Sequence, residues 1–341
     1  LQTMQHGIGL AVLHYAIAGA RVITGVGGVD EVINIIAVHA DIKGNRPLDA
    51  TQPQLHVDAG LAVQVGVTDF HRAGGDIRAA TRSPEKAERL FRSDVDVVEL
   101  DYRRASTFDA AVDGAEGIFL QAPPFDPDAR ETLVPLLDWA VQAGVGNVVM
   151  MTAMGVEVRD DLPIRRLEKH VESLGVAFTL LRPNFHMQHF AGGFLGERIR
   201  RTGAFSMPVG DARVSIVDGR DVAEVAAACL LSDEHDGKEF TLTGPEALTH
   251  QEIAETISGV IDAPVAYESV SDEEMLARLT STGWRPEIAG VVIALYQSVR
   301  GGVRAPVTGD VAQVLGRAPA AFSDFAARNT DSWLSVVGQN P

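Results

Sequence analysis

The chain has 341 residues, of which 46% are hydrophobic and 22% are charged, a composition typical of a globular protein with one large or two ordinary domains. Its formal net charge of -17 argues against direct binding of nucleic acid, because phosphate backbones attract basic surfaces. The single cysteine, Cys229, excludes an internal disulfide framework and predicts a reducing compartment, the cytoplasm. No segment reaches the roughly 18 apolar residues of a membrane span, so we expect no membrane partner.

Strands and helices alternate from about residue 55 to residue 183, which predicts a parallel sheet with helices on both faces. Strands are predicted over 76–80, 95–101, 117–122, 147–152 and 177–181. Helices are predicted over 106–112, with Ser106 as N-cap, and over 129–143 and 162–173. The fold class is therefore α/β, a Rossmann-like doubly wound parallel sheet.

From residue 184 the elements become shorter and mixed. Short elements are predicted over 193–201, 214–217, 221–231 and 239–243, followed by helices over 249–261, 272–280 and 288–299 and a strand over 265–270. Thr249 is the predicted N-cap of its helix, with Glu252 at the capping-box position. We expect a smaller mixed α/β substrate domain that lies beside the carboxyl ends of the strands.

These patterns divide the chain into three parts. Residues 55–183 form the predicted sheet domain, to which 214–243 return, and residues 184–341 form the substrate or cap region. Residues 1–54 fit neither part and are predicted to be an atypical N-terminal extension. Within it, residues 7–23 are similar to a helix and second strand of another Rossmann unit, and we favour an ordinary helix–strand extension packed on the sheet edge.

The loop that binds phosphates in such a sheet has lost most of its glycines. One strand and one helix before Asp76, where a G-x-x-G-x-x-G motif belongs, the chain reads Val57-Asp58-Ala59-Gly60-Leu61-Ala62-Val63. The β-branched side chains at 57 and 63 crowd the approach of a pyrophosphate to the backbone. Gly60 is the remaining candidate for cofactor contact in this loop.

Other residues that follow the predicted strands indicate a dinucleotide. Arg82 and Lys86 follow the strand after which an acidic residue would select NAD, and their positive charges suit a 2′-phosphate. The alternative for this pair is a solvated helix start. Further cofactor contacts are predicted where the next strands end, since ligands bind outside the carboxyl ends of strands: Gln121, Ala122, Pro123, Thr152 and Ala153. The predicted cofactor is NADP(H), with NAD(H) as second choice.

Several stretches taken together resemble NmrA-like proteins, which are atypical short-chain dehydrogenase/reductase relatives that include NAD(P)H:quinone oxidoreductases. They are Arg82-Ser83-Pro84-Glu85-Lys86-Ala87, the strand end at Asp101, Thr152-Ala153-Met154-Gly155, Leu180-Leu181-Arg182-Pro183-Asn184-Phe185-His186-Met187-Gln188 and Thr241-Leu242-Thr243-Gly244-Pro245-Glu246-Ala247-Leu248-Thr249. The resemblance implies an NADP(H)-binding Rossmann domain and a small C-terminal substrate domain. It also implies that Asp101 and Tyr102 lie near the adenine, and that Asn184 and Phe185 lie beside the nicotinamide.

The catalytic candidates are weaker. Thr152 stands where short-chain reductases often carry a hydroxyl that binds a substrate carbonyl, but its Tyr-x-x-x-Lys partner is absent. His186 or water is the alternative proton source. The family often places a Lys or His four residues before a helix Glu; Glu168 matches that Glu, and Ile164 stands at the earlier position. His186 and His189 have no acidic residue nearby, so we predict no metal site.

Three functions remain open. The first is an NAD(P)H-dependent oxidoreductase that reduces a quinone-like or small carbonyl or imine substrate by hydride transfer. The second is a non-catalytic, NADP(H)-binding redox-sensing regulator that acts through a protein partner, which Ile164 favours. The third is a member whose altered glycine loop has lost cofactor binding. A homodimer is also left open.

Overall fold

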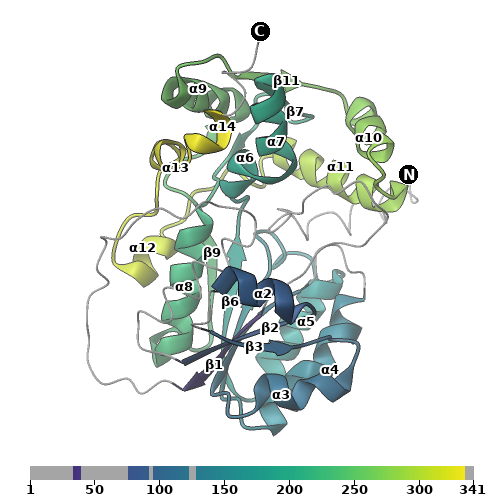
Figure 1. Ribbon diagram of the computed structural model, residues 1–341, viewed down its shortest axis with the longest axis vertical. Helices are drawn as coiled ribbons and strands as arrows, with labels where there is room; N and C mark the ends of the chain where they lie inside the picture. Colours follow the sequence, from purple (N-terminus) through teal and green to yellow (C-terminus); the bar gives the residue numbers. More distant parts are fainter. Residues whose placement is uncertain (1–33, 40–75, 92–94, 123–127, 335–341) are drawn as a thin grey trace.

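The computed structural model describes residues 34–39, 76–91, 95–122 and 128–334 (Figure 1). Within these residues the main sheet has seven strands in the order β3-β2-β1-β4-β5-β6-β9. Their bounds are β1 Asn34–His39, β2 Asp76–Thr81, β3 Asp96–Glu99, β4 Gly117–Gln121, β5 Asn147–Met151, β6 Ala177–Pro183 and β9 Lys238–Leu242. Figure 1 shows this sheet in the lower half of the molecule and most of the C-terminal helices above it.

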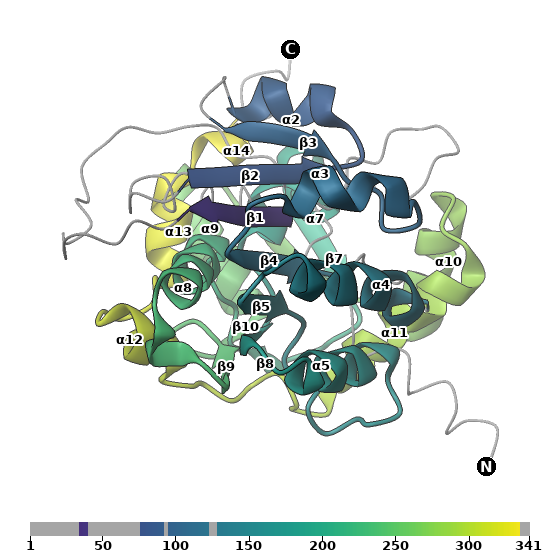
Figure 2. The ribbon, with the colours of Figure 1, turned by 90° about the horizontal axis from the view of Figure 1, so that it is seen from below.

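Helices cover both faces of the sheet. One face carries α3 (Phe108–Val112), α4 (Ala129–Gln142) and α5 (Pro163–Ser173), and the other carries α2 (Pro84–Phe91), α8 (Gly219–Leu231) and α12 (Asp310–Leu315) (Figure 2). Side chains alternate between the two faces along β5, as the period of a strand requires. Val148 and Met150 pack with the first group of helices. Val149 and Met151 pack with the second, which confirms the doubly wound α/β fold.

Strand β1 departs from the predicted parallel sheet. It lies between β2 and β4 and runs antiparallel to both, with Asn34 opposite Ala80 and Ile36 opposite Ile118. Its sequence, NIIAVH, is rich in the β-branched residues that suit a strand, but it precedes the alternating pattern from which we predicted the sheet. The strand comes from the segment set apart as an extension. The division of the chain into three parts stays a prediction, and residues 7–23 lie outside the described residues.

The predicted strands of the sheet domain are confirmed to within two residues at each end, and α4 and α5 match their predicted ranges closely. The predicted N-cap at Ser106 is wrong, because Ser106 lies inside a 3-10 turn, Ala105–Thr107, that precedes α3. The Thr107 hydroxyl donates to the carbonyl oxygen of Arg104 at 2.8 Å and accepts from the backbone N–H of Asp101 at 3.1 Å. These bonds hold the chain in a turn, so the α-helix begins later.

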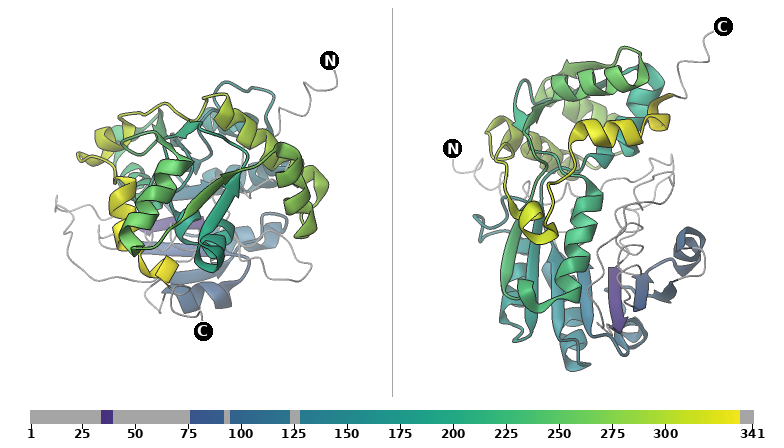
Figure 3. Two further views of the ribbon diagram at one scale, coloured as in Figure 1. Left: turned by 90° about the horizontal axis from the view of Figure 1, so that it is seen from above. Right: turned by 90° about the vertical axis from the view of Figure 1, so that its left-hand side faces the viewer.

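The C-terminal elements form a cap with its own apolar core. Its helices are α6 (Gln188–Ala191), α7 (Gly193–Thr202), α9 (His250–Ile261), α10 (Asp272–Ser281), α11 (Pro286–Arg300), α13 (Phe322–Arg328) and α14 (Asp331–Leu334) (Figure 3). Two small sheets join them: β7 (Ala204–Met207) pairs with β11 (Ala266–Ser269), and β8 (Arg213–Val214) pairs with β10 (Leu248–Thr249). The predicted capping box is confirmed, since Thr249 and Glu252 exchange both side-chain bonds with the backbone.

The chain returns from the cap to the sheet after α11. Thr308 donates its hydroxyl to the carbonyl oxygen of Thr241, and the Asp310 carboxylate accepts from the backbone N–H of Thr241 at 2.7 Å. Helix α12 then packs beside α8 and β9. This return brings residues 303–308 close to the carboxyl ends of β6 and β9. None of the described helices is long and apolar enough to cross a membrane.

Candidate functional site

The predicted site residues that the structure describes lie where the parallel strands end. Arg82 follows β2, Asp101 and Tyr102 follow β3, Gln121 ends β4 with Ala122 after it, Thr152 and Ala153 follow β5, and Asn184, Phe185 and His186 follow β6. Because parallel strands present their carboxyl ends at one edge, these residues share that edge of the sheet. It is also the edge from which the chain enters the cap after β6.

Some of the predicted cofactor residues are not placed. Gly60 and Pro123 lie outside the described residues, and Lys86 is described only as part of the backbone of α2. Arg82 is exposed in the short turn between β2 and α2. Its predicted contact with a 2′-phosphate stays a prediction.

The structure brings together Tyr102 and Gln121, two of the residues that were predicted to contact the cofactor. The Tyr102 hydroxyl donates to the backbone carbonyl oxygen of Gln121 at 3.4 Å, which ties the loop after β3 to the end of β4. The Asp101 carboxylate accepts from the backbone N–H of Arg103 at 3.0 Å. Asp101 therefore stabilises its own turn, and its predicted position near the adenine stays a prediction.

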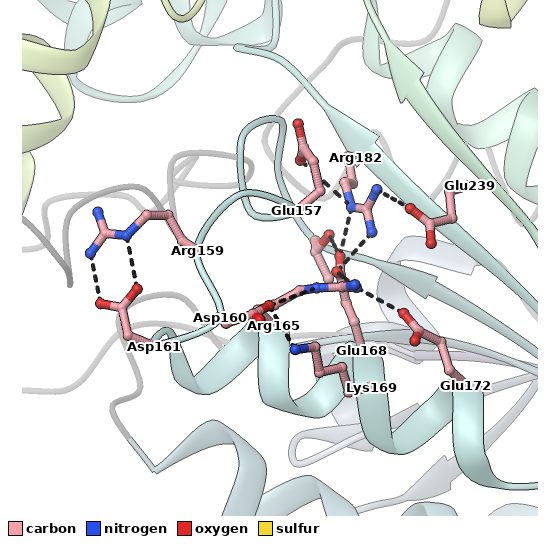
Figure 4. A network of polar contacts seen from close by, with 11 residues as sticks. Glu157, Arg159, Asp160, Asp161, Arg165, Glu168, Lys169, Glu172, Arg182 and Glu239 are labelled. Atoms are coloured by element: carbon pink, nitrogen blue, oxygen red, sulfur yellow. Dashed lines mark hydrogen bonds and ion pairs between the residues drawn. The ribbon is translucent and has the colours of Figure 1, made fainter.

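Beneath the end of β5 lies a buried network of charges centred on Glu168, which is fully buried on α5 (Figure 4). Arg182 of β6 donates two parallel bonds to the Glu168 carboxylate, at 2.9 Å from Nε and 2.8 Å from Nη2. Arg165 adds a third at 2.7 Å, and Arg182 also reaches Glu239 on β9. Burial alone would lower the pKa of Arg182, but its bonds to the two carboxylates raise the pKa above the usual value.

Thr152 belongs to this network. Its hydroxyl donates to Oε1 of Glu168 at 2.6 Å. A hydroxyl has one proton, so Thr152 cannot donate to a substrate carbonyl while this bond is made. Ile164, one turn earlier on α5, is buried in the apolar core and brings no titratable group to the edge. The geometry therefore does not favour the predicted catalytic role of Thr152.

At the end of β6, Asn184 is almost completely buried and its amide is held in one orientation. Its Nδ2 donates to the backbone carbonyl oxygen of Arg304 at 2.8 Å and to Oγ of Ser215 at 2.9 Å. Its Oδ1 is buried and has no hydrogen-bond partner among the described residues. Such an acceptor fits a ligand that brings an N–H or O–H donor.

Arg304 was missed by the sequence patterns, because no motif surrounds it. It lies 120 residues after Asn184, and only the fold brings the two together. Its guanidinium carbon lies 5.9 Å from the centre of the Phe185 ring, and its Nη1 donates to the carbonyl oxygen of Met154 in the loop after β5. Burial lowers the pKa of Arg304 to about 10, so the side chain remains a cation at neutral pH. Ser215 was missed for the same reason.

The cap closes the site with apolar and aromatic side chains. His186 and His189 are both buried, with ring centres 6.2 Å apart. A cavity of about 10 Å³, enough for about one water molecule, lies next to Phe185 and reaches His250. Its lining residues are Phe185, His189, Phe190, Leu195, Met207, Val214, Ile216, His250 and Val299. Within the described residues, no group of three or more His, Cys, Asp or Glu side chains could hold a metal ion.

The family profile of NmrA-like proteins matches residues 63–302, well over half of the chain. The chain belongs to the NmrA-like family. The matched range contains the network around Glu168, the buried Asn184 and most of the cap. It begins after Gly60, so the unusual loop at 57–63 lies almost entirely before it.

Individual relatives agree with this assignment. A protein from Xenophilus azovorans named NAD(P)H azoreductase is 31% identical over 253 residues, which cover 73% of this chain and 87% of the relative. An NADPH-dependent quinone oxidoreductase from Escherichia coli, solved in complex with NADPH, matches with a TM-score of 0.68 at 19% identity, over 79% of this chain and 96% of that one. Nmra, a negative transcriptional regulator, matches with a TM-score of 0.59 at 13% identity, over 78% and 91% of the two chains. At these identities the two structures show a shared fold and no more.

Proposed function

We propose that this NmrA-like chain is an NADPH-dependent oxidoreductase that reduces a quinone-like or other small carbonyl or imine substrate. The proposal rests on two groups that lie at the edge of the sheet where the parallel strands end. Arg82 is exposed after β2, and Asn184 presents a buried acceptor after β6. In a doubly wound sheet a dinucleotide lies across this edge, so one group suits the adenosine phosphate and the other suits the nicotinamide.

The relatives support the same chemistry. The azoreductase from Xenophilus azovorans is named for NAD(P)H, and the quinone oxidoreductase from Escherichia coli was solved with NADPH. The cofactor, when bound, would supply a hydride to an electron-poor substrate. The residues of this chain would bind and orient the reactants, and the apolar cap around Phe185 would exclude water from the pocket.

A proton would come from a group other than Thr152, whose hydroxyl already donates to Glu168. His186, at the end of β6, and water are the remaining sources. Reduction of a quinone needs no general acid at the moment of hydride transfer, because the oxygens of the product can be protonated from solvent. A quinone-like substrate therefore suits this site better than one that requires a strong acid.

The second candidate function is a redox-sensing regulator that binds NADPH without turnover and acts through a protein partner. Two observations favour it: Ile164 is a buried apolar residue at the position where the family often carries Lys or His, and Thr152 is engaged by Glu168. Both remove proton donors from the site. Neither prevents a cofactor from binding, so turnover of NADPH, and not its binding, separates the two candidates.

Calorimetric titration of the purified chain with NADPH and with NADH tests the proposal. We expect NADPH to bind more tightly than NADH, because Arg82 can pair with the 2′-phosphate. Oxidation of NADPH is then measured with a panel of quinones. Binding with no turnover above background would favour the regulator. If neither cofactor binds at millimolar concentration, the altered glycine loop would explain the loss of cofactor binding.

A further inference from the structure

The cap contains a small cavity that the side chains of its core do not fill. Its volume is about 10 Å³, enough for about one water molecule. Its walls come from α6, α7, α9 and α11, from β7 and β8, and from Phe185 after β6. The lining residues are apolar except His189 and His250. A group that enters the cavity must therefore be small and uncharged, because none of these lining residues could pair with an ion.

His250 brings a polar ring to this cavity. It is the first residue of α9 and is 3% exposed. Its Nδ1 is buried and has no hydrogen-bond partner among the described residues. The Tyr267 ring lies 5.5 Å away between ring centres, but its hydroxyl is directed to the carbonyl oxygens of Met207 and Gly210, at 3.1 and 3.2 Å. Native proteins rarely leave a buried ring nitrogen unmatched, so this wall of the cavity suits a group that has a polar atom.

The protonation state of His250 narrows that group to a hydroxyl. Burial lowers the pKa of His250 to about 4, so at neutral pH the ring has one N–H donor and one lone pair. A hydroxyl both donates and accepts, so it can pair with the ring in either tautomer, whereas a carbonyl or ether oxygen can only accept. A hydroxyl is also about the size of a water molecule, which the volume of the cavity admits.

The position of the cavity indicates which molecule supplies the hydroxyl. Phe185 is one of its walls and directly follows Asn184 after β6, so the cavity extends from the edge of the sheet into the cap. Arg82, the proposed partner of the adenosine phosphate, follows β2 on the other side of the sheet centre. A dinucleotide lies along the strand ends, and the element that covers them contacts the substrate. The group that reaches His250 therefore belongs to the substrate.

We propose that the cavity beside His250 is a specificity pocket for the substrate, and that it takes a small uncharged substituent that ends in a hydroxyl, such as a hydroxymethyl group on a quinone ring. The ring itself stays at the edge of the sheet, because the cavity has room for about one water-sized group. His250 pairs with the hydroxyl, and the apolar walls exclude charged substituents. The inference rests on the proposed reduction of a quinone-like substrate.

Two quinones of the same shape test the pocket by equilibrium binding. 2-Hydroxymethyl-1,4-naphthoquinone and 2-ethyl-1,4-naphthoquinone differ only in the hydroxyl or methyl group that ends the substituent. Their dissociation constants are measured by equilibrium dialysis against the full chain, with and without NADP⁺, which has no hydride to transfer. We expect the wild-type chain to bind the hydroxymethyl compound at least as tightly as the ethyl compound. In His250→Phe, which keeps a ring but removes its nitrogens, the ratio should shift toward the ethyl compound by about tenfold.

Further variants separate the pocket from general damage to the cap. Tyr267→Phe removes a polar atom beside His250 without touching the cavity wall, so it should keep the wild-type ratio. Val299→Leu adds a methylene at the wall and should weaken both substituted quinones about tenfold relative to unsubstituted 1,4-naphthoquinone. Val292→Leu, buried on the same helix but not in the wall, should leave that comparison unchanged. Because each value is a ratio within one protein, a general loss of affinity cancels.

The outcomes separate this inference from the function on which it rests. If the two quinones bind with the same ratio in the wild-type chain and in His250→Phe, or if neither binds with or without NADP⁺, the inference fails. It also fails if Val299→Leu binds the substituted and unsubstituted quinones in the wild-type proportion, because the substituent then lies outside the cavity. If the ratios change as expected but no quinone supports oxidation of NADPH, the pocket stands as a binding site and the proposed reductase activity fails.

Discussion

At the scale of a residue, the carboxylate of Glu168 determines how a buried charge is stabilised and where the Thr152 hydroxyl donates its proton. It is fully buried, yet it accepts from Arg182, from Arg165 and from the Thr152 hydroxyl. Moving charges out of water is costly, and such a group is tolerated only when its lone pairs are all used, as they are here. The same bonds that satisfy Glu168 occupy the proton that Thr152 would otherwise offer to a substrate.

Removing the charge of Glu168 should therefore destabilise the protein strongly. We expect Glu168→Gln to lower the free energy of unfolding by about 3 kcal/mol, because the buried Arg182 and the partly buried Arg165 lose the anion that they share. Urea unfolding followed by circular dichroism measures the change. The matched control is Glu172→Gln on the same helix, whose side chain also pairs with Arg165 but is 30% exposed, and which should cost less than about 1 kcal/mol. Equal losses of unfolding free energy in the two variants would contradict the role given to the buried Glu168.

The second prediction at the scale of a residue concerns the exposed Arg82. Arg82→Ala should weaken NADPH binding about tenfold and leave NADH binding nearly unchanged, because only NADPH has the 2′-phosphate with which the guanidinium pairs. Calorimetry with both cofactors measures the difference. Arg201→Ala, at an exposed position at the end of α7 in the cap, serves as the control. Equal losses for the two cofactors would refute the assignment of Arg82.

At the scale of elements, Gly244 explains part of the Thr-Gly-Pro stretch that follows β9. A Cβ atom added at Gly244 would lie 2.1 Å from the backbone carbonyl oxygen of Ile216, a distance that no side chain tolerates. The glycine thus lets the chain after β9 pass directly against the segment between β8 and α8. This close approach connects the edge of the main sheet to the small sheets of the cap.

Gly244→Ala should accordingly destabilise the protein by about 2 kcal/mol, since backbone must move to make room for the methyl group. Gly259 offers a contrast, because it is exposed within α9 and an added Cβ would meet nothing within 4 Å. Gly259→Ala should stabilise the protein by about 0.5–1 kcal/mol through helix propensity. Thermal unfolding of both variants measures the two changes in stability. A change of the same sign in both variants would count against the close approach at Gly244 as the cause.

At the scale of the whole molecule, stability depends on three apolar cores among the described residues, one on each face of the sheet and one in the cap. The cap core encloses a titratable group, His250. His250 is buried beside Phe190, Phe205 and Tyr267, and burial lowers the pKa of His250 to about 4. The folded protein therefore keeps this histidine neutral under conditions in which the unfolded chain already binds a proton.

This difference predicts how global stability changes with pH. Because the pKa of His250 is 6.5 in the unfolded chain and about 4 when folded, its contribution is present above pH 6.5 and is lost as the pH falls toward 4. The full loss is on the order of 3 kcal/mol. Urea unfolding at several pH values measures the slope. In His250→Phe, where the ring no longer titrates, the slope between pH 6.5 and 4 should be shallower, and an unchanged slope would exclude His250 as its source.

Much of the fold could be predicted from local patterns. The apolar run of β4 is buried on both faces, and the Thr249–Glu252 capping box begins its helix as its spacing predicts. The Leu-Arg-Pro-Asn-Phe stretch correctly pointed to the family to which the chain belongs. These features depend on residues that are close in sequence, so a short stretch contains the physical information that determines them.

The arrangement of the site depended on contacts between distant residues. Asn184 is oriented by Ser215 and by the carbonyl oxygen of Arg304, which lie 31 and 120 residues away in the chain. The register of β1 between β2 and β4 and the bond from Thr152 to Glu168 are likewise set by packing across the sheet. The sequence by itself determined most of the elements, though not β1, and the family to which the chain belongs. Only the tertiary structure decided which polar atoms are already satisfied and which, like Oδ1 of Asn184, are buried without a partner among the described residues, because burial and hydrogen bonding arise only when distant segments meet.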